Sequence, residues 1–344
     1  MDLRILNPSE YPDWDAELLR AGDYSFFHTS AWAKVLEKTY RFKPLYFGFF
    51  EEGRPVFLMP FMEVGNPLLG KRGVSLPFSD QCAPLVRKTE YLQTAVRSVI
   101  DYGAKNGWRN IEWRDDQYFA EGTLAWDSYY VHDIDLAGDE AGLFAALSPS
   151  NRRNIKKADR EGVTVKIDHS LESLKDFYRL HLITRKRHGV PPQPFAFFKN
   201  IHEYVMSQGY GIIVSARHDK KVVAASVFFN FGTKAIFKYG ASDVRYHPLR
   251  PNNLIMWEAL KWYRRQGLRM LSLARTEVEN IGLLKYKRAW GGKEDALKYF
   301  RYDIRKKTFL PQRGANDRMQ KYFFARTPRS VLRLIGRLLY RYVG

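Results

Sequence analysis

The residues with the clearest chemical potential lie in one short segment in the second half of the chain. Residues 282–292 read GLLKYKRAWGG, so that three cations alternate with two aromatic residues ahead of a glycine pair. Attack on an acyl group creates a negatively charged oxygen, and one fixed donor aimed at it is worth about 2.7–4 kcal/mol in the barrier. The segment therefore favours acyl transfer, with a solvated charged hairpin as the alternative interpretation.

Other catalytic chemistries find no matching pattern in the sequence. There is no GxSxG elbow, no GxxxxGK[ST] or GxGxxG phosphate loop and no HExxH zinc pattern. The lone cysteine, Cys82, lacks a basic context, which favours a buried and inert thiol. We therefore predict no nucleophilic triad, no dinucleotide cofactor and no metal site.

The elements that would position the lysine-rich segment repeat along the chain. An apolar run, a polar turn and a second apolar run occur at 45–63 and again at 211–231, which is a hairpin pattern. Each hairpin precedes a helical stretch, at 91–106 and 254–266, that is followed by a glycine. The repeated order predicts an α/β (α+β) architecture of two tandem domains, each a mixed sheet flanked by helices.

Length and composition agree with two domains. The chain has 344 residues, more than one core comfortably holds, and 45% of them are hydrophobic. Ser148-Pro149-Ser150 has the character of a helix start between the halves. We predict a first domain at 1–148, a second at 149–312 that carries most of the active site, and a basic helical tail at 313–344 that packs back on the first.

The tail has a periodic charge pattern. Arginine recurs every four residues from Arg329 to Arg341, and apolar residues can occupy another face of the same helix. The favoured interpretation is a closing helix packed on a domain. An interfacial helix that rests on anionic lipid is the alternative.

The formal net charge of +19 is the strongest compositional signal. Such a field attracts polyanions, so nucleic acid, phosphorylated substrates and anionic lipid are candidate partners, and a basic surface kept for solubility is the alternative. Residues 1–19 differ from a secretory signal, a single cysteine fits a reducing compartment, and no apolar run approaches the roughly 18 residues of a spanning helix. We expect a cytoplasmic protein, with the inner face of the cytoplasmic membrane as an optional site of contact.

Several stretches resemble the Fem family of aminoacyl transferases and its acetyltransferase-domain relatives in the GNAT superfamily. They are His28–Trp32, Ser75–Phe78, Arg152–Ala158, Thr184–Arg187 and Tyr286–Gly291. Their order and spacing, taken together, are fairly specific. The resemblance implies two GNAT-like domains, an active channel formed mainly by the second, and transfer of an amino acid from aminoacyl-tRNA to an amine on a peptidoglycan or other cell-envelope precursor.

The resemblance also implies roles for particular residues. Lys287 matches a lysine that stabilises the tetrahedral intermediate, and Tyr286 beside it shapes the acceptor pocket. Arg187, at the end of Thr-x-x-Arg, matches an arginine that contacts acceptor phosphates, a bond that contributes about 1.5–3 kcal/mol. Tyr239 and Asp80 fall in the cleft by similar positions. The alternatives are a helix-surface arginine for Arg187 and polar groups at the core edge for the last two.

The match departs from the family in two places. Around Arg275 the chain reads SLART, which keeps the arginine of a family substrate-binding stretch but loses its acid and its glycine. The aromatic-rich mouth of the channel keeps Trp32, whereas a family lysine that contacts acceptor phosphates falls on Leu36. These departures leave the identity of the acceptor open.

Two other functions compete with aminoacyl transfer. A CoA-dependent N-acyltransferase needs a glycine-rich loop whose amides approach the pyrophosphate, but residues 245–253, RYHPLRPNN, contain two prolines and no glycine. Residues 84–89 of the first half lack such a loop as well. We therefore expect aminoacyl-tRNA as the co-substrate and no bound cofactor, with acetyl-CoA or another acyl-CoA as the alternative donor. A noncatalytic polyanion-binding protein is the second alternative.

Overall fold

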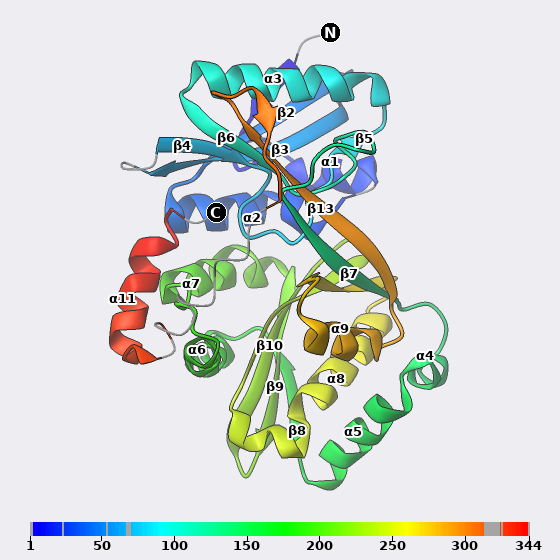
Figure 1. Ribbon diagram of the computed structural model, residues 1–344. Coiled ribbons are helices and arrows are strands. Elements are labelled where there is room, and N and C mark those ends of the chain that lie inside the picture. Colours follow the sequence, from blue (N-terminus) through cyan, green and yellow to red (C-terminus); the bar gives the residue numbers. More distant parts are fainter. Residues whose placement is uncertain are drawn as a thin grey trace. The chain divides into compact units, whose positions relative to one another are not determined.

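The computed structural model describes residues 3–22, 24–52, 54–66, 70–312, 324 and 326–342, and the chain forms two compact units (Figure 1). The first unit comprises residues 1–129, 296–315 and 338–344, and the second comprises 130–295 and 316–337. Strands β7 and β13 have residues in both units. The domain ranges expected from the sequence, 1–148, 149–312 and 313–344, stay predictions.

The first unit contains a mixed sheet and three α-helices among its described residues. Its elements are β1 (Leu3–Leu6), α1 (Trp14–Ala21), α2 (Ser30–Tyr40), β2 (Lys43–Glu51), β3 (Arg54–Asn66), β4 (Gly70–Val74), β5 (Leu85–Val86), α3 (Leu92–Lys105), β6 (Trp108–Trp113), parts of β7 (Asp127–Asp135) and β13 (Lys293–Asp303), and β14 (Thr308–Phe309). Short 3₁₀ turns occupy Phe26–His28 and Thr89–Tyr91.

The sheet of the first unit runs in the order β1-β2-β3-β4-β6-β13. Its pairs are antiparallel except β4 with β6, which is parallel because α3 connects the two strands. Helix α3 buries Ala95, Val96 and Val99 against the sheet, and its Gly103 has the ring of Trp108 within 2.8 Å of the position of a Cβ. The apolar stripe of one helix and the large aromatics of the strands thus form one core.

The second unit also has a mixed sheet, with helices on both faces. Its elements are α4 (Glu140–Ala146), α5 (Pro149–Arg160), β8 (Thr164–Asp168), α6 (Leu171–Arg187), α7 (Phe195–Tyr204), β9 (Gly211–His218), β10 (Lys221–Phe231), β11 (Lys234–Ser242), α8 (Pro251–Arg265), β12 (Met270–Glu277), α9 (Ile281–Arg288) and α11 (Arg329–Leu339). Short 3₁₀ turns occupy Met206–Gln208 and Val244–Leu249.

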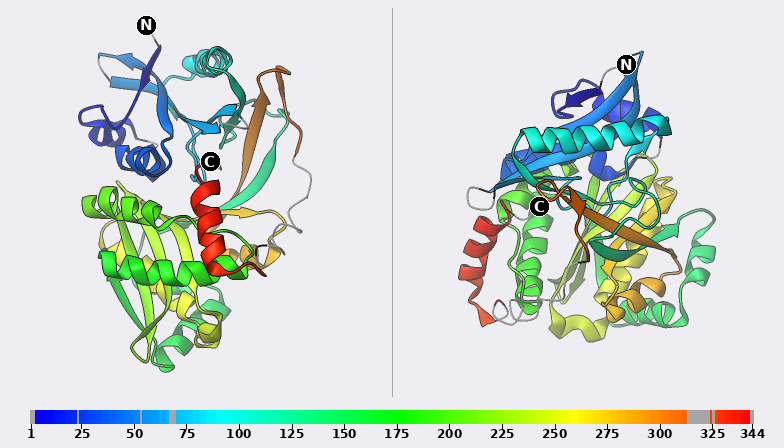
Figure 2. Two further views of the ribbon diagram at one scale, coloured as in Figure 1. Left: turned by 90° about the vertical axis from the view of Figure 1, so that its left-hand side faces the viewer. Right: turned by 45° about the horizontal axis from the view of Figure 1, so that its top comes forward.

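Strands β8, β9, β10 and β11 form an antiparallel meander, and β12 joins it parallel to β11 through the crossover helix α8. Helix α6 covers one face of this sheet and α8 covers the other (Figure 2). Successive strand residues point to opposite faces, so the uninterrupted apolar run of β10 is what a strand buried on both faces requires.

The structure confirms the α/β class and the tandem arrangement. Both predicted hairpins form, as β2–β3 and β9–β10, and helix α5 begins after Ser148, whose side chain accepts a hydrogen bond from the amide of Asn151. The helix expected at 254–266 is α8. The predicted basic tail forms a helix at Arg329–Leu339, while residues 313–323, 325, 343 and 344 lie outside the described residues.

The lysine-rich segment is a helix, so the charged-hairpin alternative is wrong. Residues 281–288 form α9, and the two glycines that follow serve close packing. Gly291 has φ 74°, and a Cβ there would lie 2.7 Å from the carbonyl oxygen of Ala146. Glycine is therefore required at this position by the backbone conformation and by the neighbouring carbonyl.

Candidate active site

The parallel strands β11 and β12 of the second unit separate part-way along their length. Their pairing covers Lys234 to Ile236 on β11 and Met270 to Ser272 on β12, although both strands continue beyond it. Ala274 of β12 adopts φ 61°, a left-handed conformation that is uncommon for residues other than glycine. Strand edges that separate in this way leave main-chain donors and acceptors available for a substrate.

The corresponding pair in the first unit stays closed. Strands β4 and β6 are paired up to Val74 and Glu112, and the amide of Ser75 then donates to the carbonyl of Glu112 at 2.8 Å. The pairing continues through the Ser75 hydroxyl, which accepts from the Arg114 amide at 2.8 Å. The open strand pair that can admit a substrate is therefore the one in the second unit.

A buried cluster of charge reinforces the closed pair of the first unit. Glu112 and Arg114 are each 5% exposed, and Arg301 and Arg72 add two further guanidinium groups around the same carboxylate. Burial raises the pKa of Glu112, but Arg114, Arg301 and Arg72 lower it further, to about 2. This carboxylate is thus fully ionised at neutral pH, and Arg114 also donates to the carbonyls of Leu76 and Ser79.

Lys287 places a cation at the open edge of β12. The residue is 3% exposed, and its Nζ donates to the carbonyl oxygens of Ala274 at 2.8 Å and Arg275 at 3.0 Å. A buried ammonium is stable only with such partners, so its position is set by the strand. Arg275, predicted as a substrate-binding residue, is therefore held next to Lys287 through its main chain.

Helix α9 is anchored at both ends, which fixes Lys287. Asn280 caps its start by accepting from the Leu283 amide at 3.2 Å. At its end the carbonyl of Ala289 accepts from the Ser148 amide at 3.0 Å and from Asn151 Nδ2 at 3.1 Å. The start of α5 therefore holds the lysine-bearing helix in place.

An ionic chain lies beside this lysine. The imidazole of buried His132 on β7 contacts Glu294 at 2.7 Å, and Glu294 accepts two bonds from Arg288, both at 2.7 Å. Burial lowers the pKa of His132 and Lys287 lowers it further, while Glu294 opposes both. The charge of Lys287 thus acts on a histidine that sequence reasoning did not single out.

Other polar and aromatic groups surround the same end of β12. The hydroxyl of Thr276 is buried, at 2% exposure for the residue, and has no hydrogen-bond partner among the described residues. Tyr286 packs on the hydrophobic core with its ring 6.0 Å from that of Trp290, and burial raises its pKa to about 12. The role of Tyr286 in shaping an acceptor pocket stays a prediction.

A second cluster of polar side chains lies at the end of β11. Ser242 Oγ lies 2.8 Å from His247 Nε2, and the Ser242 amide donates to Thr184 Oγ1 of α6 at 3.0 Å. Burial lowers the pKa of His247, and the exposed Arg187 lowers it further, against the effect of Asp243. The Thr-x-x-Arg stretch therefore lies beside a neutral histidine, whose pairing with serine the sequence did not reveal.

The remaining predicted site residues occupy different surroundings. Tyr239 on β11 joins an aromatic cluster with Phe197 and Phe198, whose ring centroids lie 6.2 and 5.6 Å away. In the first unit, Trp32 is 0% exposed and the Asp80 carbonyl accepts from the Tyr299 hydroxyl at 2.5 Å. Substrate contacts for all three stay predictions.

In the loop before α8, many main-chain amides donate hydrogen bonds to acceptors within the loop itself. The amides of Arg245 and Tyr246 both donate to Asp243, and those of Asn253 and Leu254 both donate to the carbonyl of Arg250. Two further positions, 248 and 251, are prolines and have no amide hydrogen. Few main-chain donors therefore remain at this helix start for a pyrophosphate group.

Comparison with known families identifies the second unit. The model of the acetyltransferase (GNAT) domain family matches residues 150–288. These residues form a GNAT acetyltransferase domain. The family match supports an acyltransferase, and the matched range includes α6, β11, the loop before α8, β12 and α9.

Solved structures show the same GNAT fold over most of the chain. A crystal structure of FemX is 14% identical with a TM-score of 0.69, and the match covers 87% of this chain and 97% of that one. A tandem GNAT protein from the clavulanic acid biosynthesis pathway, solved without AcCoA, is 11% identical with a TM-score of 0.58, over 88% and 98%. The C-terminal domain of a putative lysylphosphatidylglycerol synthetase from Agrobacterium fabrum is 14% identical with a TM-score of 0.53, over 83% and 91%. Comparison with curated proteins finds no match.

Within the part of the chain that the structure describes, no group of three or more histidine, cysteine or acidic side chains could hold a metal ion. No helix in the same residues is long and apolar enough to cross a membrane.

Proposed function

We propose that this GNAT protein transfers an aminoacyl group from aminoacyl-tRNA to an amine on an anionic acceptor, such as a peptidoglycan or lipid-linked cell-envelope precursor. The observation that carries the choice of donor is the loop before α8. CoA-dependent transfer needs main-chain amides that approach a pyrophosphate, whereas this loop donates its amides to Asp243 and Arg250 and contains two prolines. An aminoacyl ester on tRNA has no pyrophosphate to bind.

The open edge of β12 supports the chemical step. In the proposed reaction the acceptor amine attacks the ester carbonyl, a C–N bond forms, and the ribose oxygen of tRNA leaves with a proton. Lys287 stabilises the oxyanion of the tetrahedral intermediate, because its ammonium is held by the carbonyls of Ala274 and Arg275 in a fixed position. His247, kept neutral by burial and by Arg187, accepts the proton that the amine loses.

Charge supports the choice of partners. A net charge of +19 suits tRNA, whose binding through lysine and arginine weakens steeply with salt. The exposed Arg187 is available to a phosphate of the acceptor. One structural relative is named as a putative lysylphosphatidylglycerol synthetase, which fits an anionic, lipid-linked acceptor. A tRNA donor would place the reaction in the cytoplasm.

The first test is donor binding by the purified protein. Charged tRNA, uncharged tRNA and acetyl-CoA are titrated at 50 and 200 mM salt, and we expect tighter binding of charged than of uncharged tRNA, with a steep salt dependence for both. Equal binding of the two tRNAs together with saturable binding of acetyl-CoA would overturn the proposal. Transfer of a radiolabelled amino acid from tRNA to a lysine-bearing peptidoglycan precursor then tests the acceptor class.

An acyl-CoA donor remains the second candidate, because the matched family is described as an acetyltransferase domain. The two donors differ in a measurable way. If CoA is the donor, acetyl-CoA protects the loop at 243–254 from hydrogen exchange and tRNA does not. If tRNA is the donor, acetyl-CoA leaves exchange in this loop unchanged.

A further inference from the structure

The C-terminal helix α11 has an apolar face that stays exposed to solvent. Val331 is 43% exposed, Leu334 57% and Leu338 58%, and Leu339 adds a further 42%. Residues three, four and seven apart lie on one side of a helix, so Val331, Leu334 and Leu338 form a continuous strip, with Leu339 at its edge. Large apolar side chains gathered in this way mark an interaction surface.

An adjacent side of α11, next to Leu339, is already used for packing, which fixes the direction of the exposed strip. Leu332 is 2% exposed, and a Cβ on Gly336 would lie 2.0 Å from the carbonyl oxygen of Pro192. Figures 1 and 2 both show α11 beside α6 and α7. Packing therefore accounts for one face of the helix and leaves the leucine strip uncovered.

Arginines border the exposed strip. Arg329, Arg333 and Arg337 follow one another at four-residue steps, Arg341 continues the series just after the helix, and residues 326–342 contain no acidic residue. On a helical wheel these cations occupy the flank between the packed face and the leucine strip. A helix with apolar residues on one side and arginines beside them suits the plane between water and an anionic bilayer.

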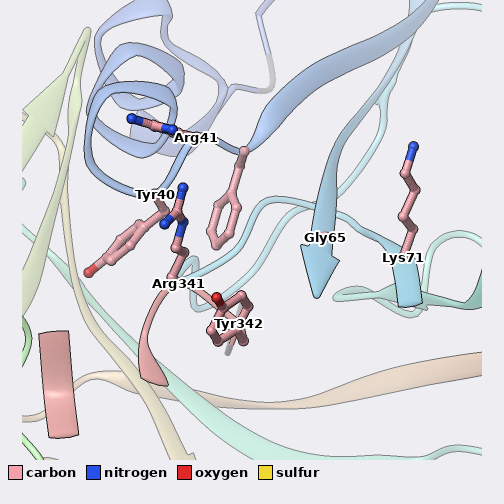
Figure 3. Close-up of a pocket in the computed structure, with 7 residues that line it drawn as sticks. Tyr40, Arg41, Gly65, Lys71, Arg341 and Tyr342 are labelled. Carbon is pink, nitrogen blue, oxygen red and sulfur yellow. The ribbon is translucent and has the colours of Figure 1, made fainter. Parts of the chain in front are cut away.

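The residues after α11 line a basic pocket of the first unit with a volume of about 410 Å³. Its walls come from Tyr40, Arg41, Phe42, Gly65, Lys71, Arg341 and Tyr342. Figure 3 shows Tyr40, Arg341 and Tyr342 on one side of the pocket and Lys71 on the other. Lys71 pairs with Glu63 at 3.0 Å, whereas Arg41 and Arg341 have no acidic partner among the described residues. Two uncompensated guanidinium groups suit the phosphate of a lipid headgroup.

We propose that α11 is a docking surface for an anionic phospholipid bilayer. The leucine strip enters the boundary between headgroups and acyl chains, and Arg329 and Arg337 face lipid phosphates, while Arg333 bonds the Tyr178 hydroxyl of α6. Within the first unit, Arg41 with Arg341 takes an anionic headgroup. This surface is independent of the proposed donor and acceptor, because none of its residues belongs to the site around β11 and β12.

The test uses the full chain with vesicles of phosphatidylcholine alone or with 30% phosphatidylglycerol, measured by flotation at low and high salt. We expect binding only to the anionic vesicles. Leu334→Glu with Leu338→Glu should weaken it at least about tenfold, and each of Arg337→Gln and Arg341→Gln about fivefold. The control is Leu124→Glu, because Leu124 is also 57% exposed but lies outside the helix, and it should bind as the unmodified chain does.

Several results would overturn the proposal. Equal vesicle binding by the Leu334/Leu338 double variant would remove the leucine strip from the surface. A dimer of the unmodified chain that the double variant breaks, seen by light scattering without vesicles, would make a second copy the occupant. If the arginine variants lose tRNA binding but keep vesicle binding, the arginines of α11 would be a nucleic-acid contact instead. Because transfer to a soluble acceptor is assayed without vesicles, failure of docking is distinguishable from failure of the proposed reaction.

Discussion

Replacing Lys287 with methionine should abolish most of the catalysis and leave the fold intact. The substitution keeps an unbranched chain of similar length in a site that is 3% exposed, but it removes the charge and the two hydrogen bonds to the carbonyls of Ala274 and Arg275. Each carbonyl left without a partner costs about 1–3 kcal/mol, and the desolvation of the ammonium, which is no longer needed, offsets part of this. We expect a modest fall in the free energy of unfolding.

The effect on the reaction should be larger. If the ammonium stabilises the oxyanion, its loss raises the barrier by about 2.7–4 kcal/mol, which lowers kcat about 100- to 1000-fold. Substrate affinity should hardly change, because the interaction forms in the transition state. The control is Lys285→Met, since Lys285 lies on the same helix α9 with its side chain exposed, and it should keep full activity.

The assay is single-turnover transfer with saturating donor, with donor binding and thermal unfolding measured on the same preparations. A Lys287→Met protein that is folded and retains kcat within about threefold would refute the oxyanion role and leave the lysine as a structural link between α9 and β12. A fall in donor affinity with unchanged kcat would refute it as well. Only loss of kcat in a folded protein with normal donor binding agrees with the reasoning.

Four other substitutions test the remaining parts of the site and the fold. Arg187→Ala should raise the acceptor KM about 10- to 100-fold because a charge-assisted bond to phosphate is lost, and unchanged acceptor kinetics would remove it from the site. His247→Gln should lower kcat about 100-fold or more, because it removes the proposed base. The unmodified enzyme should keep its activity below pH 6.5, because burial and Arg187 lower the pKa of His247. Glu112→Gln should lower the free energy of unfolding, measured in urea, by about 3–5 kcal/mol, because it leaves the buried guanidinium groups of Arg114 and Arg301 without their carboxylate. The control, Glu121→Gln at an exposed position, should change it by less than about 0.5 kcal/mol. Burial and Arg185 lower the pKa of His181 to about 3. Between about pH 6.5 and 3 only the unfolded chain binds this proton, so the free energy of unfolding falls by about 1.4 kcal/mol for each unit by which the pH is lowered. His181→Phe should flatten this slope, measured by urea unfolding at pH 7, 5 and 4.

Local patterns were enough to predict the elements and their order. Apolar runs on either side of a polar turn predicted the hairpins at 45–63 and 211–231, and Ser148-Pro149-Ser150 predicted the start of α5. These features depend on residues within a few positions of one another, so the sequence contains their causes directly. The same applies to the Fem and GNAT resemblance, which the family match at 150–288 and the fold comparisons support.

The sequence predicted part of the chemistry of the lysine-rich segment. The residue types indicated an oxyanion site with Lys287 as its cation, but a solvated charged hairpin was an equally consistent interpretation. The structure shows a helix in which Lys287 turns inward to β12 while Lys285 stays exposed. Which lysine is buried depends on how α9 packs on β12, and sequence spacing alone does not report that packing.

The sequence by itself determined the α/β class, the duplicated order of elements, the basic charge and the family resemblance, because each follows from composition or from short-range pattern. Tertiary structure alone decided that β11 and β12 separate after Ile236, that Ser242 meets His247, and that α11 buries Leu332 while exposing Leu334. The physical reason is that a site is defined by distances between side chains from different elements, and those distances exist only once the sheet has closed and its helices have packed.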